Sequence, residues 1–137
     1  MKTRYSVLVD IKQDIVKKSE TEVARSSANL SSAMLSLESS QKALEDIVLP
    51  KSGTISDLLV SRTLLSSQRE VIQNNQKQVE SAKKQVELSK EKLKSDMIEH
   101  EKFKYLELEE IKRILKEQKI LEAKELDEIA IITHNRK

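Results

Sequence analysis

Few residues of this chain could take part in chemistry. Histidine occurs twice, at His100 and His134, and cysteine is absent. Neither histidine has a second His or Cys at a spacing that suits a metal site. The absence of cysteine also excludes disulfides and thiol chemistry. We therefore expect both histidines to be surface residues and predict no metal site.

Patterns that serve catalysis or cofactor binding are missing as well. Asp127 and Glu128 are adjacent carboxylates, and neighbouring positions on a helix point to different faces, so they do not form an acid–base pair. The chain has one glycine, whereas a phosphate-binding loop needs several. We predict no catalytic residues and no cofactor, and therefore a protein that is not an enzyme.

Charge and aromatic content argue against nucleic acid as a partner. The chain has 25 Lys and Arg against 23 Asp and Glu, a net charge of +2, and phosphate binding needs a surplus of positive charge. Tyr5, Phe103 and Tyr105 are the only aromatic residues, too few for a base-stacking surface. The longest uncharged run, Ser26–Leu37, is shorter than the roughly 18 residues that suggest a membrane span. We expect a cytoplasmic protein without a transmembrane segment.

The elements that carry these residues are divided by a single break. Pro50 and Gly53 are the only proline and glycine. Pro50 cannot continue a helix and disfavours helical backbone at the residue before it, while Gly53 permits the positive φ of a tight turn. Thr54 and Asp57 have the spacing of a helix-capping box, with Asp in place of the usual Glu.

The predicted fold is all-α, with two long helices in an antiparallel coiled-coil hairpin formed by the whole chain, 1–137. We expect the first helix over about 2–48, the turn over 49–54 and the second, longer helix over about 55–134. The antiparallel arrangement follows from the short connection.

Both helices carry an apolar residue at every seventh position, which is typical of a coiled coil. In the first helix these are Val9, Val16, Val23, Leu30, Leu37 and Leu44; in the second they are Leu58, Leu65, Ile72, Val79, Val86 and Leu93. A coiled coil also needs an apolar residue three or four positions after each of these. In the first helix this companion position is poor in apolar residues. Three positions on stand Lys12, Ser19, Ser26, Ala33, Ser40 and Ile47; four positions on stand Gln13, Glu20, Ser27, Met34, Gln41 and Val48.

Because both runs have six members, we expect them to pair one to one, with Leu44 beside Leu58 near the turn and Val9 beside Leu93 at the far end. Residues 102–137 then extend beyond the first helix. Their apolar residues are Phe103, Tyr105, Leu106, Leu108, Ile111, Ile114, Leu115, Ile120, Leu121, Leu126, Ile129, Ile131 and Ile132. So much exposed apolar surface predicts a covering partner, which could be a second copy or a different protein with a hydrophobic socket.

Two terminal motifs resemble the flagellar export protein FliJ family. The first is Arg4-Tyr5-Ser6-Val7-Leu8-Val9-Asp10-Ile11-Lys12, an aromatic residue before an apolar stretch and a basic residue. The second runs from Glu117 to Ala130 and contains Leu126-Asp127-Glu128-Ile129, similar to an element near the family's C-terminus. Together with the length and the unequal helices, the likeness covers nearly the whole chain.

The resemblance implies a non-enzymatic stalk of the flagellar type III export apparatus. The end with both termini would enter the pore of the hexameric export ATPase, and the protein would also contact the cytoplasmic domain of the export gate and export chaperones. It would be cytoplasmic and peripherally associated with the inner-membrane apparatus. The residues expected to bind the ATPase are Arg4, Tyr5, Leu8, Ile11, Lys12, Ile111, Ile114, Leu115, Lys119, Leu126, Asp127, Glu128 and Ile129. No residue is assigned to the gate, because no aromatic motif lies near the turn.

Two other functions suit the same hairpin. One is a structural coiled coil that associates with itself through residues 102–137. The other is the stalk of a non-flagellar type III secretion ATPase.

Overall fold

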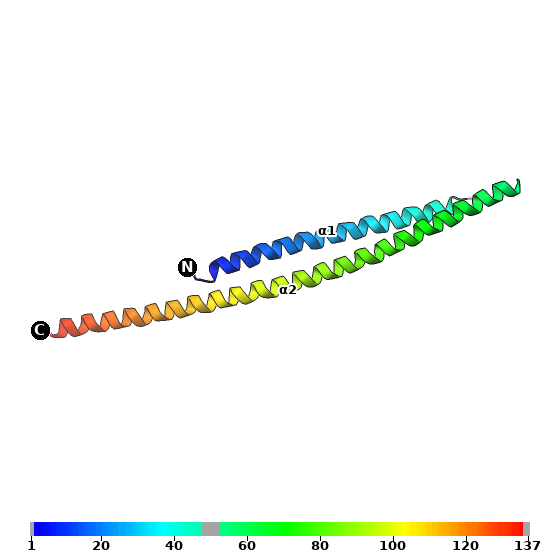
Figure 1. Cartoon of the computed structure of the whole chain (residues 1–137). Coiled ribbons are helices and arrows are strands. Elements are labelled where there is room, and N and C mark those ends of the chain that lie inside the picture. Colours follow the sequence, from blue (N-terminus) through cyan, green and yellow to red (C-terminus); the bar gives the residue numbers. More distant parts are fainter. Residues whose placement is uncertain (1, 48–52, 136–137) are drawn as a thin grey trace. The chain divides into compact units, whose positions relative to one another are not determined.

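A computed structural model describes residues 2–47 and 53–135 as two antiparallel helices, α1 (Ser6–Glu45) and α2 (Ile55–Asn135) (Figure 1). The helices pack against each other in a hairpin of which α2 is the longer member, and the described residues contain no strand. The predicted all-α hairpin is therefore confirmed. Residues 49–52 of the predicted turn lie outside the described residues.

α1 begins later than the expected start near residue 2, because the chain is capped first. The Ser6 hydroxyl accepts a hydrogen bond from the Thr3 amide at 2.8 Å, and the Thr3 hydroxyl accepts one from the Tyr5 amide at 3.1 Å. These bonds satisfy amide groups that have no partner within the first turn of a helix.

The start of α2 has the predicted capping box. The Asp57 amide donates to the Thr54 hydroxyl at 3.2 Å, and the Asp57 carboxylate accepts from the Thr54 amide at 3.3 Å. Gly53 has φ +146°, the positive value that its position before the cap suggested. Local sequence therefore determines where α2 begins.

Burial follows the seven-residue repeat. Between residues 9 and 47, all six residues of the first apolar run are buried or half-buried. The six residues that lie three positions after them are buried or half-buried as well. The companion position of the repeat in the first helix is therefore the one three residues on, which is occupied mainly by serine and alanine. On α2 the run is buried or half-buried from Leu65 to Leu93, whereas Leu58 is 42% exposed.

The interface between the helices is thin. Among the described residues, the buried apolar side chains are Val16, Val79 and Val86, and no side chain is completely buried. The buried polar side chains are Ser19, Ser26, Ser40 and Ser89. Small residues at these positions let the two backbones approach, but they contribute little apolar area.

The predicted pairing of the helices is wrong. One-to-one matching of the apolar runs places Lys12 opposite Lys90, but its ammonium lies 5.5 Å from the ring centroid of Phe103. Near the other end of α1, the Ser40 carbonyl accepts a hydrogen bond from the Gln68 amide at 2.8 Å. α1 therefore packs against a part of α2 further along the chain than predicted, since a seven-residue repeat alone also provides apolar matches at other offsets.

The shift shortens the uncovered part of α2. Arg4 contacts Glu110, and Phe103, Ile111 and Ile114 are half-buried, although all three lie in the segment 102–137 that was expected to be bare. From Leu115 to Asn135, every residue of α2 is exposed. We call residues 115–135 the bare segment.

The chain forms two compact units, each with a piece of both helices. One unit is Lys18–Lys94; the other combines Met1–Lys17 with Ser95–Lys137. Val79 and Val86 are buried in the first unit. We call the second the terminal unit. Over the residues described, neither helix has a stretch apolar enough to cross a membrane.

Candidate partner-binding site

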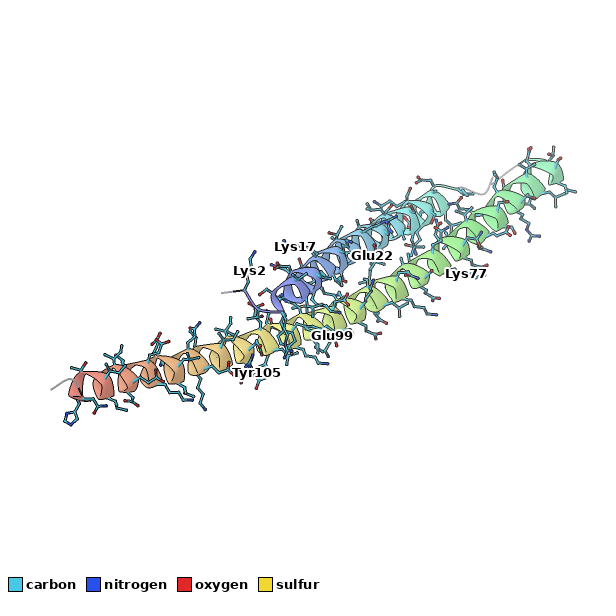
Figure 2. All side chains as sticks on the ribbon, turned by 60° about the vertical axis from the view of Figure 1, so that its left-hand side comes forward. Lys2, Lys17, Glu22, Lys77, Glu99 and Tyr105 are labelled. Atoms are coloured by element: carbon cyan, nitrogen blue, oxygen red, sulfur yellow. The ribbon has the colours of Figure 1, made fainter. Side chains whose placement is uncertain are left out.

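All of the residues predicted to bind a partner belong to the terminal unit. They fall into two groups. Residues 4–12 of the chain and residues 103–114 of α2 form a packed section in which α1 and α2 are in contact. The bare segment follows, and its side chains project from α2 with no second helix beside them (Figure 2).

Arg4 and Tyr5 lie just before α1 in the packed section. The Arg4 guanidinium lies 5.0 Å from the centroid of the Tyr5 ring and 3.8 Å from the Glu110 carboxylate. The Arg4 side chain is 72% exposed, and Tyr5 is half-buried. Arg4 therefore has both an aromatic and an acidic neighbour while most of its surface stays accessible.

Leu8, Ile11 and Lys12 continue this surface along α1. Leu8 is 38% exposed and Ile11 is 47% exposed, so both present apolar area to solvent. Lys12 is half-buried, and its ammonium lies over the Phe103 ring, an attraction that holds α1 to α2. The sequence predicted these three residues as partner contacts but did not predict that Lys12 would face Phe103.

Glu110 is at the centre of a charged cluster that sequence reasoning missed. Arg113 donates to the Glu110 carboxylate through Nη2 at 2.7 Å and Nε at 3.3 Å, and to Glu117 through Nη1 at 2.6 Å. Only 13% of the Glu110 side chain is exposed. The spacing of Glu110, Arg113 and Glu117 by three and four residues was the available signal, since such positions are neighbours on a helix.

The cluster shifts the pKa values of Glu110 and Arg113. The hydrogen bonds from Arg113 lower the pKa of Glu110, and the positive charges of Arg113 and Arg4 lower it further against an opposing effect of burial. The same hydrogen bonds raise the pKa of Arg113. Both groups are therefore held in their charged forms.

The predicted residues of α2 are divided between the two parts of the site. Ile111 and Ile114 are half-buried in the packed section. The others lie in the bare segment and are exposed: Leu115, Lys119, Leu126, Asp127, Glu128 and Ile129. The structure thus brings Ile111 and Ile114 into the neighbourhood of α1, whereas the remaining six are presented by α2 alone.

The bare segment combines apolar and acidic character. Its large apolar residues are between 44% and 67% exposed: Leu115, Ile120, Leu121, Leu126, Ile129, Ile131 and Ile132. It contains three lysines against five aspartates and glutamates. A binding partner of matching chemistry would therefore offer an apolar surface with some positive charge.

Comparison with known proteins identifies the family. Among the described residues, no group of three His, Asp or Glu side chains is placed to hold a metal ion. Searches of curated proteins and of solved structures returned no match. The model of the family described as flagellar FliJ protein matches residues 1–137, the whole chain. The chain therefore belongs to the flagellar FliJ family, whose members are components of the flagellar export apparatus and not a known family of enzymes.

Proposed function

We propose that the protein is the non-enzymatic stalk of the flagellar export ATPase. The bare segment and the neighbouring packed section enter the central pore of the ATPase hexamer, and the chain links the ATPase to the export gate and to export chaperones. It works in the cytoplasm, peripherally associated with the inner-membrane apparatus. The observation that carries this proposal is the exposed apolar surface of the bare segment.

The distribution of that apolar surface favours a partner that surrounds the helix. Successive helical residues are turned by about 100°, so Leu115, Leu126 and Ile129 lie near one face of α2. Ile120 and Ile131 fall on a second face. Leu121 and Ile132 fall on a third. A single partner helix would cover one stripe, whereas a ring of subunits around the bare segment would cover all three faces.

The length of the bare segment also suits a deep socket. Residues 115–135 are helical throughout, and at about 1.5 Å per residue they extend roughly 30 Å. An apolar helix of this length exposed to water is a liability for aggregation unless something covers it. A socket of comparable depth would remove this surface from water.

The packed section extends the proposed insertion surface. Leu8 and Ile11 are exposed on α1. Like Ile111 and Ile114 of α2, they are predicted from the sequence to bind the partner. The ion pair between Arg4 and Glu110 connects the residues before α1 to α2. We therefore assign the packed section to the mouth of the pore, where two helices need more room than one.

Contacts with the gate and chaperones are assigned to the other unit. The first turns of α2 expose five large apolar residues, at 42% to 79%: Ile55, Leu58, Leu59, Val60 and Leu64. Among the described residues, they are the exposed large apolar side chains of α2 that lie nearest to the connection between the helices.

Truncation tests the ATPase assignment. The chain ending at Ile114 keeps the packed section and loses the bare segment. Binding to the purified export ATPase should fall at least tenfold, measured by calorimetry, while circular dichroism of the remaining helices keeps its thermal transition. Unchanged ATPase binding by this truncated chain would overturn the proposal.

Paired substitutions test whether the partner surrounds the helix. Leu126→Ser with Ile129→Ser alters one face, and Leu121→Ser with Ile132→Ser alters another; Ala123→Ser is the matched control on the same segment. A surrounding pore requires both pairs to weaken ATPase binding and the control to leave it unchanged. If only one pair mattered and the chain sedimented as a dimer that truncation abolished, self-association would replace the stalk as the function.

A further inference from the structure

One side of α1 within the unit Lys18–Lys94 is exposed and carries no charge. Its large apolar residue, Leu35, is 66% exposed. The residues of this side follow one another at intervals of three or four, a spacing that places them along one face of a helix. We call them the outer face of α1: Ala28, Ser32, Leu35, Ser39 and Ala43.

Two open hollows border the outer face. One, of about 540 Å³, lies between the helices, where Val71 of α2 borders it with 45% of its surface exposed. Leu35, Ser39 and Ala43 line both hollows, so a large side chain stands beside two small ones that leave room. The other hollow, of about 550 Å³, is lined by residues from α1: Leu35, Glu38, Ser39, Lys42, Ala43 and Asp46.

The spacing of the outer face is symmetric about Ser39. Leu35 and Ala43 stand four residues before and after it, and Ser32 and Asp46 stand seven residues before and after it. A second α1 that runs antiparallel, with the two Ser39 residues side by side, therefore places Leu35 of each copy opposite Ala43 of the other. Ser32 then meets Asp46, whose carboxylate can accept from the serine hydroxyl. Such an exchange of identical contacts defines a two-fold interface.

The charges beside the outer face suit the same arrangement. Glu38 and Lys42 form an ion pair of 3.4 Å within α1, and their side chains are 59% and 71% exposed. In the antiparallel pair, Glu38 of each copy lies about 3 Å along the axis from Lys42 of the other, so opposite charges meet twice. A parallel pair would instead place Glu38 against Glu38. The surface is thus complementary to itself in both size and charge.

We propose that the outer face of α1 binds the outer face of a second copy, antiparallel and two-fold symmetric about Ser39, with Leu35 of each chain filling the hollow beside Ala43 of the other. Residues 32–46 extend roughly 21 Å, and two helices in contact over this length bury less than the roughly 1,600 Å² of a standard stable interface. The dimer therefore forms reversibly at high protein concentration. It uses no residue of the bare segment.

Disulfide crosslinking tests the two-fold axis, because the chain has no cysteine of its own. Ser39→Cys places both thiols at the axis. Ser32→Cys is the matched control on the same face, since its two copies would lie roughly 21 Å apart along the helices, too far for a disulfide. With a mild oxidant, Ser39→Cys should form covalent dimers at least tenfold faster than Ser32→Cys. Equal rates would overturn the proposal.

A mixture of two variants tests the direction. Chains with Leu35→Cys and chains with Ala43→Cys should crosslink with each other faster than either does alone, because like residues would lie roughly 12 Å apart along the axis. Faster crosslinking of each variant with itself would indicate a parallel pair and would overturn the arrangement.

Charge reversal within the Ser39→Cys chain tests the border contacts. Glu38→Lys sets lysine against Lys42 of the second copy and should slow crosslinking at least threefold, whereas adding Lys42→Glu should restore the rate. Glu70→Lys makes the same change of charge two residues from both Gln68 and Ile72, which places it on the opposite side of α2, and should have no effect. Failure of the double reversal to restore the rate, with helicity unchanged by circular dichroism, would overturn the proposal.

Sedimentation of the cysteine-free chain identifies which surface associates. Its average mass should rise with protein concentration, and Leu35→Ser should abolish the rise. Leu126→Ser with Ile129→Ser, on the bare segment, should leave it unchanged. Association abolished by the bare-segment pair alone would assign the contact to that segment, and a monomer at every concentration would leave the outer face to a different protein; either result would overturn the proposal.

Discussion

The Arg4 guanidinium lies 3.8 Å from the Glu110 carboxylate, and this contact joins the residues before α1 to the first part of the segment 102–137, which the apolar repeat had left uncovered. Glu110 is also hydrogen-bonded to Arg113. One carboxylate thus links two cations from different parts of the chain. The contact shows that the covered part of α2 extends as far as Glu110.

Acid should weaken the attachment of the start of α1. The contacts with Arg113 and Arg4 lower the folded-state pKa of Glu110 below its ordinary value of 4.5. Its stabilising contribution is therefore present above about pH 4.5 and is lost as the pH falls through the lower folded value. Amide hydrogen exchange of residues 6–12 should accelerate over this acidic range.

Glu110→Gln should remove that acid-dependent change. The variant loses the charge and should show fast exchange of residues 6–12 already at neutral pH. Glu122→Gln, on the bare segment, is the control and should keep the parental pH profile. Identical profiles for the parent and Glu110→Gln would show that Glu110 does not attach α1.

Val86→Asp should strongly destabilise the hairpin. Val86 is 8% exposed, so the substitution places a carboxylate in the interface without an observed partner. We expect a loss of about 2–4 kcal/mol in the free energy of unfolding, measured by denaturant titration followed by circular dichroism. Leu88→Asp is the matched control, because Leu88 is 57% exposed; an equal loss there would contradict the assigned interface.

Thr54→Ala should destabilise the first turn of α2. The substitution removes the hydroxyl that accepts from the Asp57 amide, and loss of such a cap costs about 1 kcal/mol. Hydrogen exchange at residues 55–58 should increase accordingly. Ser56→Ala alters an exposed neighbour and is expected to change exchange much less; equal effects would mean that the capping box contributes nothing specific.

Gly53→Ala should be unfavourable for two reasons. The backbone at Gly53 has φ +146°, which side-chain-bearing residues rarely adopt. A Cβ atom there would also lie 2.9 Å from the Asp57 carboxylate. We expect a loss of about 1 kcal/mol or more in thermal or denaturant unfolding, and an unchanged or raised stability would contradict the observed backbone at this residue.

The sequence by itself determined that the chain forms two helices and where α2 begins. Gly53, Thr54 and Asp57 act within a few residues of one another, so their conformation depends on local chemistry that the sequence states directly. The seven-residue repeat likewise identified which face of each helix is buried, because helical geometry fixes that face once the period is known.

Only the tertiary structure decided how the helices align and which α2 residues remain bare. A repeating apolar pattern has the same match at several offsets, so its energy does not select one. The observed alignment is seen in individual contacts between distant residues, such as Asn75 with Ser40 and Arg4 with Glu110. Such contacts have no periodic signal in the sequence, and for this reason the bare segment begins at Leu115 instead of residue 102.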